Sequence, residues 1–449
     1  MHHKDVTGIL RKFPTSKKQA WLGLAASALI CLLVFIITIP LPRVDNHLIG
    51  SDGIKYYAIL RSLVLDQDFD FANDFALLDT PSSIVAETGK SENPFAIGTA
   101  LLWLPFFLVA HFLSLALSAL GLNLATNGIS YLYESLTLIG SILYASVGFI
   151  LVFQTASRLF NRQATLIATI SMWWATPAIY YIIAEPSMSH ALTLFTNALF
   201  LFIWYPPRFT RTTQDWITLG FITSLAALVR WQDGILILLP IIELCWWVWD
   251  KKISLQEGRR YLFMFGISVL AGFLPQFIMW SQVYGSPLLI PQGESFMNWL
   301  TPQPWLTLFS ARHGLITWHP IFLLALLGLI PLWKRDKIIV LTISYIFLTQ
   351  LYINSSVSDW WAGDAFGGRR FIGLIPFFVL SFSALASWFQ KEKRLHLLVS
   401  ALMILILWNG LSFIQYRFGF VSKSGALTLQ ELTLDRLLVP WTLLRSFLS

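Results

Sequence analysis

Long apolar runs separated by short polar segments dominate this chain of 449 residues. A helix needs about 20 mostly apolar residues to cross the hydrocarbon core of a bilayer. The runs are continuous and do not alternate, which excludes the strands of a membrane barrel. The pattern predicts an all-α polytopic membrane protein with about 11 transmembrane helices, at residues 20–41, 131–155, 165–184, 188–205, 215–229, 234–250, 261–283, 317–333, 338–353, 371–389 and 396–414.

One further apolar run, residues 94–122, has a different interpretation. If it crossed the membrane, the basic clusters that follow it would all lie outside. Such clusters favour the cytoplasmic side. We therefore expect a re-entrant or interfacial hairpin on the outer side, broken at Gly98, Pro105 and Gly121. The alternative is a twelfth span.

Charge sets the expected orientation. Residues 1–19 are predicted to form a cytoplasmic tail, because they are rich in lysine and arginine. Residues 20–414 are expected to form one membrane domain that includes an outer loop at 43–93. Residues 415–449 are expected to form a short outer tail. A multi-pass protein of the bacterial inner (plasma) membrane fits this arrangement.

Composition excludes several function classes. Charged residues make up 12% of the chain, against about 25% in soluble proteins. The net charge of +7 comes from clusters between apolar runs, so it does not indicate nucleic-acid binding. Cys31 and Cys245 lie within apolar runs, which argues against a disulfide framework.

The outer loop holds the strongest candidate chemistry. It is mostly acidic, and Asp52, Lys55, Tyr56 and Tyr57 are crowded into its first part. In a helix Asp52 and Tyr56 share a face. A carboxylate at the membrane surface can remove a proton from an acceptor hydroxyl. We expect Asp52 to be such a base, with Tyr56 and Tyr57 as substrate-binding residues beside it; the alternative for Asp52 is a solvated loop acid.

Other polar residues gather at predicted outer junctions. Lys90 precedes an apolar run, where it either binds a phosphate or anchors the chain at the interface. Glu185 and His190 share one junction, and His190 is either a substrate contact or a helix-cap residue. Arg230 lies at the next junction, where a local pair with Asp233 is the alternative to a substrate contact. His313 adds positive charge in a later outer segment.

The second strongest stretch is 358–371, SDWWAGDAFGGRRF. Arg369 and Arg370 are adjacent arginines on the predicted outer side, where basic pairs are disfavoured. Guanidinium groups suit phosphate oxygens. Trp361 is expected to stack on a sugar or line a lipid groove, and Asp364 lies in the same turn. The alternative is a tight interfacial turn with aromatic anchors.

These features resemble the GT-C superfamily of membrane glycosyltransferases, in the branch that is protein O-mannosyltransferase-like and aminoarabinose-transferase-like. The first outer loop of that family has an Asp-Glu-x-x-Tyr pattern, and Asp52-Gly53-Ile54-Lys55-Tyr56 is similar to it. Leu65-Asp66-Gln67-Asp68 resembles a later part of the pattern. Gly53 departs from it, because the family has a glutamate there.

The resemblance implies a hexosyl- or pentosyltransferase with a polyprenyl-phosphate-linked sugar donor. The acceptor would be a glycan, lipid or protein hydroxyl, activated by Asp52 for a displacement with inversion at C1. Arg369, Arg370 and Lys90 would hold the donor phosphate. No cofactor is implied with certainty; a divalent metal at Asp66, Asp68 and Asp70 is one alternative. A transporter or flippase, and a polymerase or ligase of lipid-linked glycans, are the competing functions.

Overall fold

The structure is a computed structural model that describes residues 16–41, 47–205 and 211–448. Within these ranges every regular element is helical, apart from two isolated bridges, Ile84 with Ser91 and Met297 with Val357. The predicted all-α class is therefore confirmed. The described ranges do not include the basic cluster expected before residue 16, the first residues of the outer loop, or Arg208.

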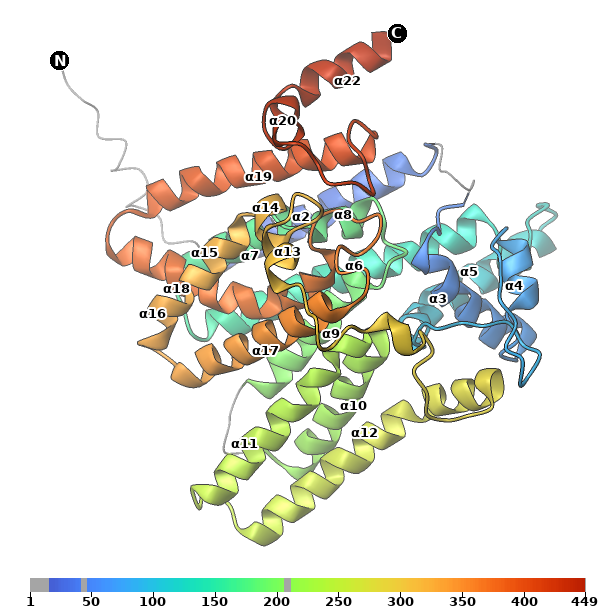
Figure 1. The fold of residues 1–449 in the computed structure, drawn as a ribbon, viewed down its shortest axis with the longest axis horizontal. Helices are drawn as coiled ribbons and strands as arrows, with labels where there is room; N and C mark the ends of the chain where they lie inside the picture. Colours follow the sequence, from blue (N-terminus) through green and yellow to red (C-terminus); the bar gives the residue numbers. More distant parts are fainter. Residues whose placement is uncertain (1–15, 42–46, 206–210, 449) are drawn as a thin grey trace. The chain divides into compact units, whose positions relative to one another are not determined.

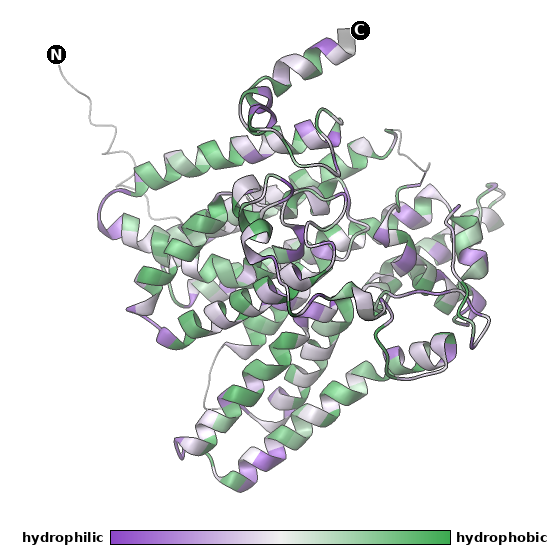
Figure 2. Cartoon of the chain, in the orientation of Figure 1, coloured by the Kyte–Doolittle hydropathy of each residue, from purple (hydrophilic) through white to green (hydrophobic). Residues whose placement is uncertain are grey.

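Eight helices in the described part of the chain are long and apolar enough to cross a membrane. Figure 2 shows hydrophobic residues along the lengths of such helices, while hydrophilic residues concentrate at their ends and in loops. The eight are Lys17–Thr38, Gly98–Ala119, Tyr131–Ser157, Trp231–Trp249, Leu255–Tyr284, Lys337–Ser356, Arg369–Lys391 and Leu395–Arg417.

Four of the predicted spans are not among these eight, because they are short or broken in the structure. Residues 165–184 form two helices that meet at Pro177, and residues 317–333 form three pieces separated around Pro320 and Gly328. Proline lacks the backbone N–H that a continuous helix needs. The spans predicted at 188–205 and 215–229 are helices of 15 and 17 residues. The predicted number of spans is therefore not confirmed.

The hairpin expected at residues 94–122 is wrong. Helix α5 runs without a break from Gly98 to Ala119 and contains Pro105 in its interior. Prolines are tolerated in apolar helices of membrane proteins, where local adjustments satisfy the freed backbone group. Gly98 serves packing, because a Cβ there would overlap the backbone of Leu228.

Contacts of His47 and Leu48 with the start of α6 agree with a segment, 49–133, that starts and finishes on one side. The Leu48 N–H donates to the Glu134 carboxylate at 2.5 Å, and His47 Nδ1 lies 2.9 Å from the same carboxylate. Glu134 belongs to the first turn of α6 (Tyr131–Ser157). The start of α6 therefore lies beside the residues that follow α2 (Lys17–Thr38). That α5 does not cross the membrane stays a prediction.

The chain divides into two compact units, each built from separate segments. Unit 2 comprises Cys31–Val147 and Tyr181–Phe296. In it α10 (Thr213–Val229) and α12 (Leu255–Tyr284) run side by side (Figure 1), with close approach at Gly220 and Gly272. Unit 2 contains α5 and parts of α2, α6 and α8 (Ala178–Ile183). Its other helices are α3 (Asp52–Arg61), η1 (Ser62–Asp66), α4 (Ala72–Leu77), α9 (His190–Trp204), α10 (Thr213–Val229), η2 (Trp231–Ile237), α11 (Leu238–Trp249), α12 (Leu255–Tyr284) and η3 (Glu294–Phe296).

Unit 1 comprises Met1–Ile30, Gly148–Tyr180 and Met297–Ser449. Helix α18 (Ile375–Lys391) packs along α7 (Arg162–Trp174) and α15 (Ile321–Leu327) in this unit (Figure 1). Its helices are α7 (Arg162–Trp174), α13 (Pro304–Phe309), α14 (Leu315–Trp318), α15 (Ile321–Leu327), α16 (Leu329–Trp333), α17 (Lys337–Ser356), η4 (Arg369–Leu374), α18 (Ile375–Lys391), α19 (Leu395–Arg417), α20 (Leu429–Leu432), α21 (Leu434–Leu437) and α22 (Val439–Leu448).

Short polar residues set the start of several helices. Asn161, Thr212, Ser254 and Asp336 each accept a hydrogen bond from the first turn of the helix that they precede. Such caps satisfy backbone donors that have no partner inside the helix. They explain why α7, α10, α12 and α17 begin where the sequence changes from polar to apolar.

Candidate functional site

Asp52 is the first residue of α3 in unit 2, and its side chain is half-buried. An acidic residue in the first turn interacts favourably with the positive end of the helix dipole. Ser51 precedes it with a φ of 53°, a left-handed conformation that is rare for serine. Gly53 follows it, and a Cβ at that position would lie 2.5 Å from the Ser187 Cβ. The start of α3 is therefore fixed tightly against the segment that contains Ser187.

Tyr56 is buried one helical turn after Asp52. Its hydroxyl donates to Ser189 Oγ at 3.1 Å, and its ring meets Phe95 and Trp103 edge-on. A buried phenol needs a hydrogen-bond partner for its O–H. Ser189 supplies it, so Tyr56 links the face of α3 that holds Asp52 to the residue before His190.

Arg230 joins the same network. Its Nη1 donates to Ser189 Oγ at 3.3 Å and lies 3.2 Å from His190 Nδ1, and its Nη2 donates to Gln232. Guanidinium groups only donate, so His190 Nδ1 accepts and the ring proton of neutral His190 lies on Nε2. The structure therefore brings Tyr56, His190 and Arg230 together around Ser189.

Two further polar residues hold this network in place. The Thr193 hydroxyl, one turn along α9, donates to the Asp233 carboxylate, which is buried. Sequence reasoning missed Ser189 and Thr193. The signal was present, because both flank His190 at a helix start, where a buried hydroxyl has to find a polar partner.

Lys55 and Asn93 lie at the other side of α3. The Asn93 side chain is fully buried and donates to the Lys55 carbonyl at 2.9 Å. Lys55 Nζ lies 3.8 Å from the centre of the Phe75 ring. Burial lowers the pKa of Lys55, and the nearby Glu92 carboxylate acts in the opposite direction. Asn93 was missed by sequence reasoning, which had considered only its neighbour Lys90.

The end of α3 forms a second buried cluster. Arg61 Nη1 donates to Asp66 at 2.6 Å and to Asp74 at 2.7 Å, and Nε donates to the Asn127 carbonyl. Burial is the main cause that raises the pKa of Asp74, to about 6, although Arg61 acts against it. The Tyr57 hydroxyl is also buried and donates to the Gly128 carbonyl at 2.6 Å. These contacts tie α3 to the segment after α5, and they engage the phenol that we expected to bind substrate.

A divalent metal does not fit the acidic residues of the outer loop. Asp66 accepts from Arg61 and Asn73, while Asp68 accepts from Ser62 and from the Asp70 N–H. Among the residues that the structure describes, no group of three or more histidine, cysteine or acidic side chains is placed to hold an ion. No step of the mechanism below uses a metal.

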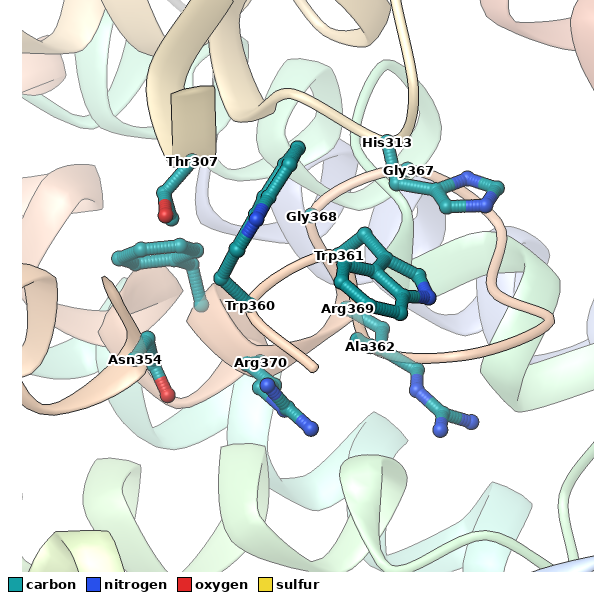
Figure 3. A pocket seen from close by; sticks show the side chains of 11 residues that line it. Thr307, His313, Asn354, Trp360, Trp361, Ala362, Gly367, Gly368, Arg369 and Arg370 are labelled. Carbon is teal, nitrogen blue, oxygen red and sulfur yellow. The ribbon is translucent and has the colours of Figure 1, made fainter. Parts of the chain in front are cut away.

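The stretch 358–371 lines a small open pocket within unit 1. Arg370 donates to the Asp359 carboxylate at 2.7 Å and to its carbonyl at 2.9 Å. Figure 3 shows the Arg369 and Arg370 guanidinium groups pointing to the same side of the pocket. Arg370 therefore forms an ion pair within its own loop, an environment that the sequence did not indicate.

Aromatic and basic residues line the rest of this pocket. The Arg312 guanidinium lies 4.0 Å from the centre of a Trp361 ring. His313 is buried, and its pKa falls to about 4 because burial, Arg312 and Arg369 all disfavour the charged ring. His313 is therefore neutral at physiological pH, contrary to the positive charge that the sequence suggested.

The remaining predicted site residues are Lys90, Glu185 and Asp364, and they differ in exposure. Lys90 is half-buried in a turn that the Ile84–Ser91 bridge closes. Glu185 is half-buried at the start of the segment that leads to His190. Asp364 is exposed and does not line the pocket of unit 1.

No protein-family model and no curated protein matches this chain. Among solved structures the chain is similar to ArnT from Cupriavidus metallidurans bound to undecaprenyl phosphate, with 13% identity over 94% of this chain and 72% of ArnT, and a TM-score of 0.47. The apo form of ArnT gives 13% identity, coverage of 95% and 73%, and a TM-score of 0.48.

The chain is also similar to the oligosaccharyltransferase AglB from Archaeoglobus fulgidus in complex with an inhibitory peptide and a dolichol-phosphate. The identity is 13%, the TM-score is 0.46, and the match covers 92% of this chain and 56% of AglB. At these values no residue role passes from either protein to this chain.

Proposed function

We propose that this protein is an inverting glycosyltransferase of a bacterial inner membrane, which uses a polyprenyl-phosphate-linked sugar as donor. The acceptor is a hydroxyl group of a glycan, lipid or protein at the outer face. One observation supports this most directly. The helix that begins with Asp52 is fixed, through Gly53 and Tyr56, against the segment 187–190, and the Arg230 side chain reaches Ser189 and His190 of that segment.

The reaction needs one base and a group that stabilises a leaving phosphate. Asp52 removes the proton of the acceptor hydroxyl, and the acceptor oxygen forms a bond to the sugar C1. The bond between C1 and the phosphate oxygen breaks, and its electron pair leaves with the polyprenyl phosphate. Because this is a single displacement, the configuration at C1 inverts. The balance of atoms is complete without a further reactant.

Arg230 is suited to the leaving phosphate. Ser189 and His190 orient its guanidinium, and a fixed cation stabilises charge that develops on a phosphate oxygen. His190 acts as a positioning residue, because its Nδ1 accepts from Arg230. A transporter would instead place ionisable residues near the middle of the bilayer, whereas Asp52 and Arg230 lie at helix ends.

The decisive test replaces Asp52 by asparagine and assays sugar transfer from a polyprenyl-phosphate donor in membranes. A general base contributes about 10²–10⁴-fold, so we expect D52N to lose activity by that factor while it still binds donor. Asp79→Asn is the matched control, since Asp79 is an exposed acid of the same outer loop. Normal turnover by a folded D52N protein would remove Asp52 from the mechanism.

Two further measurements test the remaining parts. The anomeric configuration of the product distinguishes inversion from retention. Arg230→Gln should lower kcat, while Arg369→Gln and Arg370→Gln test whether the arginines of unit 1 contribute to donor affinity. If all three variants retain both kcat and KM, these arginines do not hold the phosphate.

A further inference from the structure

The last two helices of unit 1 have two different faces. Helices α21 (Leu434–Leu437) and α22 (Val439–Leu448) both pack against α19. Leu438, between them, keeps right-handed helical backbone angles, so side chains at helical spacing line up across both helices. Arg436 and Val439 point into the protein, each with 1% of its surface exposed. These two residues mark the inward face of the segment 434–448.

The face opposite Arg436 and Val439 is apolar and exposed. Its side chains recur at the three- and four-residue spacing of a helical stripe, and each of them is at least half exposed. The outward face of a helix that packs on a protein in water is normally polar. An exposed apolar patch of this kind marks a surface that contacts a protein or a membrane. We call it the C-terminal stripe; it consists of Leu434, Leu437, Leu438, Trp441 and Leu444.

Hydrogen bonds fix the position of this segment along α19. Gln415 Nε2 donates to the Glu431 carbonyl of α20 at 2.9 Å, and Gln415 Oε1 accepts from Arg436 Nε at 3.3 Å. The Arg436 guanidinium also lies over the Trp408 ring, 5.0 Å from its centre. Figure 1 shows α20 next to α19. Because Gln415 lies two residues before α19 ends, the stripe is held near the C-terminal end of that helix.

The surface of α19 indicates what covers the stripe. Helix α19 is long and apolar enough to cross a membrane, and Met403, Ile404 and Leu407 on it are more than half exposed. Ile404 of α19 and Leu429 of α20 line the same open apolar groove. The exposed apolar surface of this candidate span thus continues onto the helices that follow it. Lipid that covers α19 therefore also reaches the segment that carries the stripe.

Length and charge favour a position in the membrane interface over a further span. Residues 434–448 form about 22 Å of helix, whereas the hydrocarbon core of a bilayer is about 30 Å thick. Asp435 and Arg445 place a charge near each end of this segment. The Arg445 guanidinium lies 4.8 Å from the centre of the Trp441 ring. Tryptophan rings and the long stems of arginine are both suited to the level of the lipid head groups.

We propose that the C-terminal stripe is an interfacial membrane anchor, on the side of the bilayer where α19 ends. Leu437, Trp441 and Leu444 insert at the boundary between head groups and acyl chains, as the apolar face of an interfacial helix does. Thr442 and Ser446, which lie outside the stripe and are exposed, face water. The partner is the lipid surface itself and not one particular lipid. This anchor is independent of the reaction proposed above.

The test measures the depth of spin labels on the full-length protein in nanodiscs of phosphatidylcholine and phosphatidylglycerol. The exposed Cys245 is replaced by alanine, the buried Cys31 is kept, and this parent protein gives the background signal. Single cysteines for labelling are introduced by L437C, W441C and L444C on the stripe and by T442C and S446C as matched controls. Collisions with oxygen, which concentrates in the bilayer, are compared with collisions with a water-soluble nickel chelate.

We expect labels on the stripe to have a severalfold higher ratio of oxygen to nickel collisions than the labels at Thr442 and Ser446. Leu437→Glu places a charge in the stripe and should lower this ratio for the label at L444C. Thr442→Glu, the matched control, should leave it unchanged. Both glutamates lie at exposed positions, so the melting temperature in detergent should stay that of the parent protein.

Three results would overturn the anchor. Equal ratios at the stripe and at the controls would show that water covers both faces. Labels on the stripe that neither reagent reaches would show that a protein surface covers it, and spin–spin distances between two copies would then identify a dimer. A ratio at L444C that Leu437→Glu does not change would show that the stripe does not hold the segment in the membrane.

Discussion

Arg61 and Arg436 are both buried arginines, yet their surroundings are opposite. Arg61, at the end of α3 in unit 2, donates to two carboxylates and a carbonyl. Arg436, in α21 of unit 1, has one amide oxygen as partner and two terminal nitrogens with none among the described residues. Both side chains are less than a tenth exposed, so burial alone does not distinguish them.

The difference separates a buried cation that its own fold neutralises from one that it does not. A buried arginine that its own fold neutralises holds elements together, as Arg61 holds α3, α4 and the segment around Asn127. A buried arginine that its fold leaves without a counter-ion costs stability unless a ligand supplies the missing charge. The following predictions test this distinction, from the largest expected effect to the smallest.

The largest effect is expected from Arg61→Met. It leaves Asp74 buried without its cation, and breaking one side of a buried ion pair costs about 3–5 kcal/mol. Thermal unfolding in detergent should show a large loss of stability for R61M. Arg436→Met, measured in the absence of lipid, should change the melting temperature little, because no partner loses its cation.

The control for this comparison is the double variant Arg61→Met with Asp74→Asn. Removing the stranded carboxylate should restore part of the lost stability. If R436M in the absence of lipid is as unstable as R61M, the two arginines are equivalent and the distinction does not hold.

The second prediction concerns Asp74 and pH. Its pKa is raised from 3.8 to about 6, so the folded state binds this proton more tightly than the unfolded state. The free energy of unfolding should therefore fall as pH rises from about 4 to about 6, by about 2–3 kcal/mol from this group. Arg61, Asp66 and Asp68 are the charged groups around it.

Melting temperatures measured from pH 4.5 to pH 7.5 check this expectation. Other groups also titrate in that range, so the informative quantity is the difference between wild type and Asp74→Asn. Asparagine does not ionise, and the variant should lose this part of the pH dependence. Identical profiles for the two proteins would contradict the assigned pKa.

The smallest of these effects is expected at Gly53, at the opposite end of α3 from Arg61. Gly53→Ala places a Cβ 2.5 Å from Ser187 Cβ and 2.8 Å from the Ser187 carbonyl oxygen. Overpacking of this kind costs about 1–3 kcal/mol, and it should also lower sugar transfer because Asp52 moves with the helix. Gly266→Ala is the control, since a Cβ at Gly266 meets nothing within 4 Å. Equal activity in both variants would show that the position of α3 is not critical.

Hydropathy and charge predicted the helical class and most of the long helices. Apolar periodicity does not report where an apolar helix breaks, so the interruptions around Pro177 and Gly328 were missed. Charge counting suggested a hairpin at 94–122, but it constrains only the side on which a segment ends. It says nothing of the backbone between those ends, which is one helix here.

For a similar reason, only some of the residues of the candidate site could be predicted from the sequence. Tyr56, His190 and Arg230 were selected because polar residues beside apolar spans usually have partners, and the structure joins them. The linking residue, Ser189, was not selected, because the sequence indicates that a buried hydroxyl at a helix start needs a partner but not which residue that partner is. The absence of a glutamate at position 53 was visible, but its cause was not: the close approach to Ser187 leaves no room for any side chain.

The hydrogen bonds from His47 and Leu48 to Glu134 have a consequence for protein engineering. They hold the two ends of the segment 49–133 next to each other, as the ends of an inserted domain would be. Grafts succeed where the ends of a segment lie close together. The segment is thus a natural cassette, and a chimaera that exchanges it between chains of this kind can keep the flanking helices unchanged.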